Sequence, residues 1–221
     1  MLKLIIFDFD GTLADTRRNI IMTMQQTMRH LGLETADEPS CAATIGLPLA
    51  ACFRQLYPSL DDAAIQSCAD TYRHLFEINK KRLAPQLFPH VADTLQWLRD
   101  QGCVLTIASS RSSASLHDFL RDMALDSHIT YVLGADNVEH AKPHPEPVLK
   151  TLAALGISPA ETLVVGDMPV DIMMGSGACA ATCGVTYGNA TREQLEQAHA
   201  DHIIDDMAEL KDIVKAAASH P

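Results

Sequence analysis

Two aspartates stand directly after the first apolar run of the chain, within Asp8–Leu13 (DFDGTL). In an open parallel sheet, ligands bind beyond the carboxyl ends of the strands, so both carboxylates are expected where a site would lie. The spacing of Asp8 and Asp10 aims both side chains toward the same side of the strand end, and Gly11 permits a tight exit. Acids this close together repel each other and usually need a cation.

A second pair of acids follows a later apolar run, Leu163–Val165, with Asp167 near its end and Asp171 four residues further along. Singly, either acid could be an ordinary helix N-terminal residue, favoured by the helix dipole. With Asp8 and Asp10 they form a predicted cluster of four carboxylates at one rim of the sheet. Such a cluster needs a hard cation, and Mg²⁺, held by one or two carboxylates and a substrate phosphate, fits this donor set best.

Hydroxyl groups and one lysine supply the complementary side of the predicted site. Ser109 and Ser110 follow the apolar run Val104–Ala108, where hydroxyls and the amides of a helix start can hold phosphate oxygens. Ser109 alone could equally be a helix N-cap. Lys142 lies in Ala141–Pro147, where three prolines would hold its ammonium group in a fixed place. A phosphate-binding pocket is therefore predicted beside the acids.

Short apolar runs rich in β-branched residues must position these groups. They are Leu4–Phe7, Val104–Ala108, Ile129–Leu133 and Leu163–Val165, with weaker runs at Thr182–Thr186 and His202–Ile204. Runs of this kind suit strands that are buried on both faces. Helix-patterned stretches lie between the later runs, so the sequence predicts an α/β fold with a parallel sheet and helices on both faces.

The region from Thr16 to Pro85 breaks this alternation, because it contains helical patterns and no convincing strand. Apolar residues three or four apart run from Ile20 to Leu31, and again from Ile65 to Phe76. We therefore expect a helical cap over residues 16–85, inserted into a core domain made of residues 1–15 and 86–221. The Met-rich stripe of the first helical pattern is expected to be core packing.

The composition restricts the class of protein. The 221 residues are 47% hydrophobic and 20% charged, which is typical of a globular chain and excludes disorder and coiled coil. A net charge of −11 disfavours nucleic acid as a partner. No apolar run is long enough for a signal-peptide core or a membrane span, so a cytoplasmic protein without a membrane partner is expected. The six cysteines include no C-x-x-C pair and are expected to be buried, reduced thiols. The sequence leaves the oligomeric state open.

The order of the motifs resembles the haloacid dehalogenase superfamily, and in particular its phosphoglycolate-phosphatase-like branch. DxDGT, a strand followed by Ser, K-P-x-P-E-P and GDxxxD occur in that order between Asp8 and Asp171, with the helical insertion where that branch has its cap. The resemblance implies a Rossmann-like core. It also implies Asp8 as the nucleophile, Asp10 as general acid and base, and Ser109 and Lys142 as binders of the phosphoryl group.

The same resemblance implies a Mg²⁺ site. Asp8, Asp10 and Asp167 would be its ligands, with Asp10 coordinating through its backbone carbonyl and Asp171 serving either as a further ligand or as a support for the others. The sequence departs from many members of the family at Met168, where a small hydroxyl residue is common. This difference removes no charge from the site.

Residues and resemblance together predict a Mg²⁺-dependent phosphatase that acts through an aspartyl phosphate on a small phosphorylated metabolite, phosphoglycolate-like or pyrophosphate. Two alternatives stay open. One is a sugar phosphomutase of the β-phosphoglucomutase type, which would use the same groups; the other is a binding module without catalysis, which would have no reason to keep four mutually repelling acids. Haloacid dehalogenation is disfavoured, because that reaction does not use the acid/base step that Asp10 implies.

Two further patterns have plainer explanations beside them. Gly175–Ala180 matches the dinucleotide fingerprint G-x-G-x-x-A, but it follows a helix-like stretch instead of opening one after a strand, so we reject it. In the cap, Thr44–Leu49 opens a helical pattern that resembles the segment other family members bring over the active site. We hypothesise that this helix start and Arg54, or Lys80–Arg82, help to select the leaving group; a solvated hinge is at least as compatible with the sequence.

Overall fold

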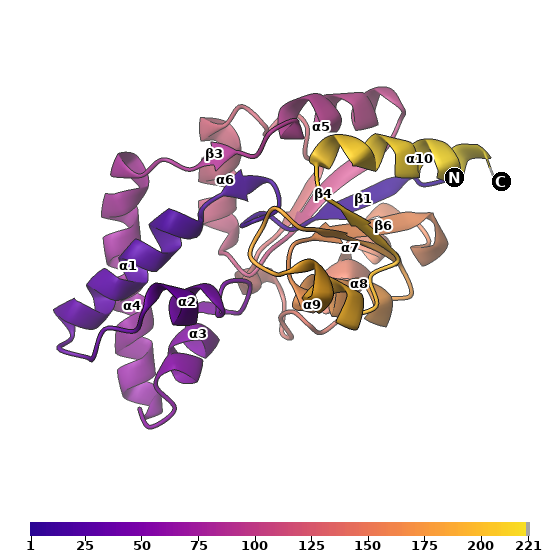
Figure 1. Cartoon of the computed structure of the whole chain (residues 1–221). Coiled ribbons are helices and arrows are strands. Elements are labelled where there is room, and N and C mark those ends of the chain that lie inside the picture. The colour runs from indigo at the N-terminus through magenta and orange to yellow at the C-terminus, as the bar shows by residue number, and fades with distance from the viewer. Residues whose placement is uncertain (220–221) are drawn as a thin grey trace.

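A computed structural model describes residues 1–219, which form a layered α/β unit beside a group of helices (Figure 1). The main sheet has six strands: β1 (Leu4–Phe7), β4 (Val104–Ala108), β5 (Tyr131–Leu133), β6 (Thr162–Gly166), β7 (Ala181–Val185) and β8 (His202–Ile204). Neighbouring strands pair in parallel, in the order β5-β4-β1-β6-β7-β8. The predicted fold class and the predicted strands are therefore confirmed, although β5 begins at Tyr131 and not at Ile129.

Helices cover both faces of this sheet. They are α5 (Val91–Asp100), α6 (Ser113–Asp122), α7 (Glu146–Leu155), α8 (Pro169–Gly177), α9 (Arg192–Gln197) and α10 (Leu210–Ser219). In Figure 1, α5 and α10 lie on one side of the sheet, and α7, α8 and α9 lie on the other. The helix α7 ends at Gly156, whose φ of 65° is the left-handed conformation that glycine adopts without steric cost.

The central strand β1 separates two apolar layers, because successive residues of a strand point to opposite faces. Leu4 and Ile6 pack in one cluster with residues of α7 and α8. Ile5 and Phe7 belong to the other cluster, with residues of α5 and α10. All four side chains are fully buried, so β1 is anchored on both faces immediately before Asp8.

Four helices form the cap, the segment that connects β2 (Ala14–Asp15) to β3 (Gln86–Leu87). They are α1 (Arg17–His30), α2 (Glu38–Ala42), α3 (Leu49–Leu56) and α4 (Asp62–Arg82). Met24 and Met28 of α1 are buried, and α1 packs along α4, so the Met-rich stripe is core packing as predicted. Asp61 caps α4 by accepting a hydrogen bond from the Ala64 amide at 2.8 Å.

A short antiparallel ladder joins the two crossings between sheet and cap. Ala14 pairs with Leu87, and Asp15 pairs with Gln86. The sequence predicted no strand at either place, because a two-residue strand is too short to show an alternating pattern. The ladder therefore holds side by side the two segments by which the chain enters the cap and returns to the core.

Three smaller expectations have mixed outcomes. Five of the six cysteines are buried, but Cys179 is exposed, so the expectation was wrong for this residue. It follows the end of α8 with a positive φ of 59°, where the chain turns at the surface.

Gly175 and Gly177 lie near the end of α8 and not at a helix start, which agrees with rejecting the dinucleotide fingerprint. Within residues 1–219, no helix has the length and apolar character to cross a membrane.

The buried position of β1 leads to a stability prediction. We expect Ile6→Ala to lower the free energy of unfolding by about 2–5 kcal/mol, because it leaves a cavity at a fully buried site. Denaturant unfolding measures the change. The matched control is Ile78→Ala in α4, where an exposed side chain is removed and a change within about 0.5 kcal/mol is expected. Equal losses in the two variants would contradict the assigned burial of β1.

Candidate active site

Three of the predicted acids meet at the carboxyl ends of β1 and β6. Asp8 follows β1, and its backbone amide donates a hydrogen bond to the Val165 carbonyl of β6 at 2.8 Å. Asp167 follows β6, and Asp171 lies in the first turn of α8. One carboxylate oxygen from each of these three residues lies within 4.8 Å of the other two, and all three side chains are buried. The three acids are thus placed as a group that could hold a cation.

Lys142 supplies the positive charge inside this group. Its Nζ donates hydrogen bonds to Asp8 Oδ1 at 2.7 Å and to Asp171 Oδ1 at 2.6 Å, and only 3% of its side chain is exposed. Burial by itself would lower the pKa of Lys142, but the attraction of the two carboxylates outweighs it and holds that pKa above its ordinary value. Lys142 is therefore a fixed cation against both acids.

One lysine does not neutralise three carboxylates, and the raised pKa values of two of the acids reflect this excess of negative charge. Burial raises the pKa of Asp8 to about 7; Lys142 opposes this rise, and repulsion from Asp171 adds to it. Burial together with repulsion from Asp8 and Asp171 also raises the pKa of Asp167. The fully ionised group therefore needs a further positive charge. A cluster of hard oxygen donors with excess negative charge fits a divalent cation such as Mg²⁺.

Neighbouring loops fix Asp167 in place. Its Oδ2 accepts hydrogen bonds from the backbone amide and the side-chain amide of Asn189, at 2.7 and 2.8 Å, and its Oδ1 accepts one from Thr12 Oγ1 at 3.3 Å. Gly11 passes close by with a φ of +87°, and a Cβ there would lie 2.2 Å from Asp167 Oδ2. Glycine at position 11 thus allows both the turn after β1 and the approach of that turn to Asp167.

Asp10 has a different partner from the other acids. Its carboxylate accepts two hydrogen bonds from Arg111, from Nε at 3.0 Å and from one terminal nitrogen at 2.6 Å. The guanidinium group of Arg111 lies 4.7 Å from the ring centre of Phe76 in the cap and 4.9 Å from that of Phe119 in α6. This largely buried, bidentate pair links the DxDGT motif to the loop after β4.

The two predicted phosphate-binding serines lie in different surroundings. Ser109 directly follows β4, and its Oγ accepts a hydrogen bond from the Arg111 amide at 3.3 Å. Ser110 Oγ donates to the backbone carbonyl of Gly46 in the cap at 2.6 Å. Ser109 lines the same cavity as Asp8 and Asp10, whereas the hydroxyl of Ser110 ties the loop after β4 to the cap.

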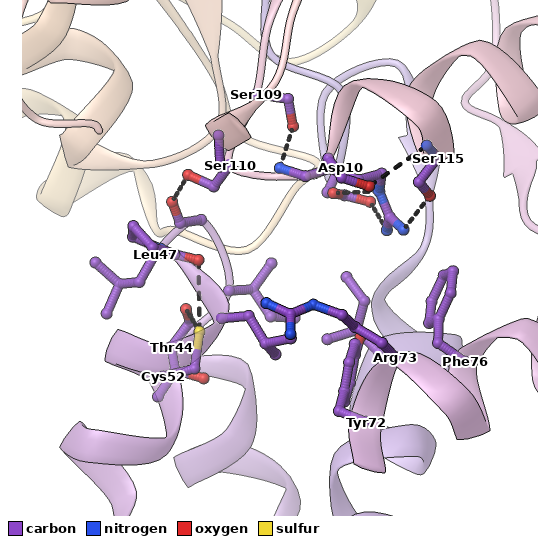
Figure 2. Close-up of a pocket in the computed structure, with 18 of the residues that line it drawn as sticks. Asp10, Thr44, Leu47, Cys52, Tyr72, Arg73, Phe76, Ser109, Ser110 and Ser115 are labelled. Carbon is purple, nitrogen blue, oxygen red and sulfur yellow. Dashed lines mark hydrogen bonds and ion pairs between the residues drawn. The ribbon is translucent and has the colours of Figure 1, made fainter. Parts of the chain in front are cut away.

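A cavity of about 530 Å³ opens between sheet and cap, with Asp8, Asp10 and Ser109 among its lining residues. Figure 2 shows Asp10, Ser109 and Ser110 along one side of it and Thr44, Leu47, Tyr72 and Phe76 of the cap along the other. The cap segment 44–50 contributes a continuous part of the wall, and it contains Thr44–Leu49, the segment for which the sequence suggested a role in selecting the leaving group.

The other cap residues of that hypothesis lie elsewhere. Arg54 pairs with Asp62 at an exposed position, and Lys80 pairs with Glu77 and Asp118. The side chain of Lys81 lies outside the part of the chain that the structure describes. Arg54 and Lys80 are therefore engaged by acids of the protein and do not line the cavity described here.

Sequence reasoning missed three residues of this site: Thr12, Arg111 and Asn189. Thr12 lies inside the DxDGT motif and Arg111 directly follows the two predicted serines, but neither had an assigned role. Asn189 follows β7, the strand beside β6, and a polar residue after a strand end was the available signal for it. No pattern in the sequence pairs Arg111 with Asp10, because their contact depends on how two loops pack.

The comparison with known families agrees with this geometry. A family model described as haloacid dehalogenase-like hydrolase matches residues 5–185, a span that contains all of the acids described above and most of the chain. The chain belongs to the haloacid dehalogenase-like hydrolase family. The predicted family and the prediction of an enzyme are thereby confirmed.

Individual family members match over nearly their whole length. "Probable phosphatase IndB" of Dickeya dadantii is 38% identical over 212 residues, which cover 95% of this chain and 92% of that protein. "Pyrophosphatase PpaX" of Anoxybacillus flavithermus is 34% identical, with 95% of each chain covered. The crystal structure of a "predicted phosphoglycolate phosphatase" from Haemophilus somnus is 25% identical, covers 96% of this chain and 98% of its own, and superimposes with a TM-score of 0.89.

The buried ion pair predicts a measurable cost when one partner is removed. We expect Arg111→Ala to lower the free energy of unfolding by about 3 kcal/mol or more, because it leaves the largely buried Asp10 carboxylate without its partner and removes the cation that lies against Phe76 and Phe119. Denaturant unfolding measures this loss. Arg121→Ala, which removes an exposed arginine paired with Asp118, is the control, with an expected change of less than about 1 kcal/mol. Similar values for both variants would argue against the buried pair.

The raised pKa values predict how metal and pH act together. The ordinary pKa of an aspartate such as Asp8 is 3.8, and its pKa in the folded protein is about 7. The unfolded chain therefore loses this proton more easily, so the metal-free protein should lose stability as the pH rises between these two values. The pKa of Asp167 is also raised in the folded protein, so its ionisation likewise lowers the stability of the metal-free protein as the pH rises. Added Mg²⁺ should raise the thermal unfolding midpoint clearly at about pH 8 and little at about pH 5. Scans in EDTA and in MgCl₂ test this; an equal shift at both pH values would contradict it.

Proposed function

We propose that this protein is a Mg²⁺-dependent phosphatase that hydrolyses a small phosphorylated metabolite through an aspartyl phosphate on Asp8. The observation that carries the proposal is the position of Asp8. It is a buried carboxylate that contacts a buried lysine, lies beside two further acids and lines the cavity under the cap. Relatives named phosphatase and pyrophosphatase support the same reaction class.

Asp8 would attack the phosphorus atom of the substrate. A bond forms between a carboxylate oxygen and phosphorus, and the bond between phosphorus and the ester oxygen breaks, so one difficult hydrolysis becomes two easier steps. An anionic nucleophile and an anionic ester repel each other. Lys142, held against Asp8 and Asp171, reduces this repulsion and keeps Asp8 oriented. Ser109, which lines the same cavity, would donate a hydrogen bond from its hydroxyl group to a phosphoryl oxygen.

Asp8 and Asp167, with the backbone carbonyl of Asp10, would hold the Mg²⁺ ion. When bound, the ion would neutralise charge on the phosphoryl oxygens. Asp171 has a different place in this proposal: its Oδ1 accepts a hydrogen bond from Lys142 Nζ at 2.6 Å, and its Oδ2 accepts one from the Met168 amide at 3.0 Å within the first turn of α8. Of its two possible roles, this favours Asp171 as a support that positions Lys142.

Asp10 would move the protons of the reaction. It would protonate the leaving oxygen in the first step and take a proton from the water that hydrolyses the aspartyl phosphate in the second. The Asp10 carboxylate lines the cavity but is bound by Arg111. In the acid step it must therefore exchange at least one of these hydrogen bonds for the leaving oxygen.

Asp8→Asn is the direct test of the proposal. Phosphate release from para-nitrophenyl phosphate in MgCl₂ is expected to fall by roughly 10³-fold or more, because a neutral amide cannot form the phosphoenzyme. Asp126→Asn, at an exposed position away from the cavity, is the control and should keep its activity. Full activity of Asp8→Asn, or no phosphate release by the unaltered protein with any divalent cation, would overturn the proposal. Label that stays in a sugar bisphosphate would indicate the phosphomutase instead.

A further inference from the structure

The part of the cavity that faces the leaving group is largely apolar. Apart from the acids and serines of the sheet side, its wall includes aliphatic, sulfur-containing and aromatic side chains of the cap: Ile20, Met24, Leu47, Leu49, Tyr72 and Phe76. Figure 2 shows Leu47, Tyr72 and Phe76 around the cavity, across from Asp10. At about 530 Å³, the cavity falls within the range of sites for whole small molecules and exceeds what a second phosphate or a glycolate would fill.

The charged residues that line this cavity are mostly acidic. Four of them are acids, namely Asp8, Asp10, Glu77 and Asp136, and two are bases, namely Arg73 and Arg111. Pyrophosphate and phosphoglycolate both have leaving groups that carry negative charge of their own. Such a group would need a cation free to receive it, because an unpaired charge in a partly apolar cavity is costly.

Arg111 is not free in this sense. Its Nε and one terminal nitrogen bind the Asp10 carboxylate, and the other terminal nitrogen donates to Ser115 Oγ at 3.3 Å. The guanidinium group also lies against two aromatic rings, with its central carbon 4.7 Å from the ring centre of Phe76 and 4.9 Å from that of Phe119. Two of its N–H groups are thus taken by Asp10, so an anionic leaving group at Arg111 would compete for the guanidinium charge with the residue proposed to protonate it.

Arg73 also offers little free positive charge to the leaving group. It pairs with Asp70, one turn earlier in α4, at 2.6 Å, and its side chain is 59% exposed at the rim of the cavity. Its charge is therefore largely compensated and screened by water. Neither basic residue of the described wall presents an uncompensated positive charge to the leaving group.

We infer that the leaving group is a neutral alcohol with an apolar or aromatic part, so that the substrate is a monophosphate ester of a neutral, ring-sized molecule and neither phosphoglycolate nor pyrophosphate. This inference rests on the proposed phosphatase function and names the substrate class of that same site. The aromatic wall formed by Tyr72 and Phe76 suits a ring, and the acids of the wall suit hydroxyl donors.

The test compares esters that differ in one property at a time. Glycerol 3-phosphate and 3-phosphoglycerate share their carbon skeleton and differ in a hydroxymethyl against a carboxylate group. We expect kcat/KM to be at least about tenfold higher for glycerol 3-phosphate, because the described wall offers the carboxylate no uncompensated positive charge. Uridine 5′-monophosphate, which adds a neutral ring system, should exceed glycerol 3-phosphate, and pyrophosphate should be the poorest of the four.

Matched variants test whether the cavity wall causes the preference for glycerol 3-phosphate over 3-phosphoglycerate. Ala50→Lys adds a cation at an exposed position that lines the cavity, and should reduce the preference for glycerol 3-phosphate over 3-phosphoglycerate several-fold. Gln55→Lys adds the same charge at an exposed position of α3 away from the wall, and should leave the ratio unchanged. Arg73→Gln should also leave it unchanged if the charge of Arg73 is compensated.

The possible outcomes separate the two proposals. Equal or higher kcat/KM for 3-phosphoglycerate or pyrophosphate, or a selective loss of these substrates in Arg73→Gln, would overturn the inference and leave the phosphatase function standing. Phosphate release from none of the esters, including para-nitrophenyl phosphate, would overturn the proposed function and the inference with it. Higher kcat/KM for the neutral esters, together with the expected response of Ala50→Lys, would establish the substrate class.

Discussion

The contact of Lys142 with Asp8 and Asp171 is the interaction on which the site depends. Buried carboxylates repel each other and lose hydration, so they can be close together only where positive charge is buried with them. Lys142 supplies one such charge inside hydrogen-bond distance of two acids. The raised pKa values of Asp8 and Asp167 show that this is not enough for the whole group. The acidic group is therefore suited to a divalent cation, which would supply the missing positive charge.

The sheet topology is what brings these acids together. β1 lies between β4 and β6, with Phe7 opposite Ile107 on one side and opposite Val165 on the other. Residues that follow the ends of parallel neighbouring strands are neighbours in space, however far apart they are in the chain. Asp8 and Asp167 meet for this reason. The burial of β1 on both faces, which stabilises the sheet, also fixes the nucleophile of the proposed reaction.

This part of the molecule could be predicted from the sequence, because continuous apolar runs identify buried strands and each acid follows such a run. Other parts could not. The β2–β3 ladder is too short to leave a periodic signal. The contact of Arg111 with Asp10 depends on two rings, Phe76 from α4 and Phe119 from α6, and on the packing of two loops. Cys179 stands in an apolar pattern, but the end of α8 turns it to the surface.

Arg111 would also connect substrate selection with the acid step of the proposed reaction. Arg111 binds Asp10 on the sheet side and contacts Phe76 on the cap side, and all three residues line the cavity. A displacement of α4 relative to the sheet would take Phe76 away from the guanidinium group and expose Arg111 to water, which weakens its hold on Asp10. A leaving group that packs on Phe76 would keep this arrangement, whereas a second anion would compete with Asp10 for it. In the proposed reaction, the same contact would therefore determine which leaving groups fit and when Asp10 is free to protonate them.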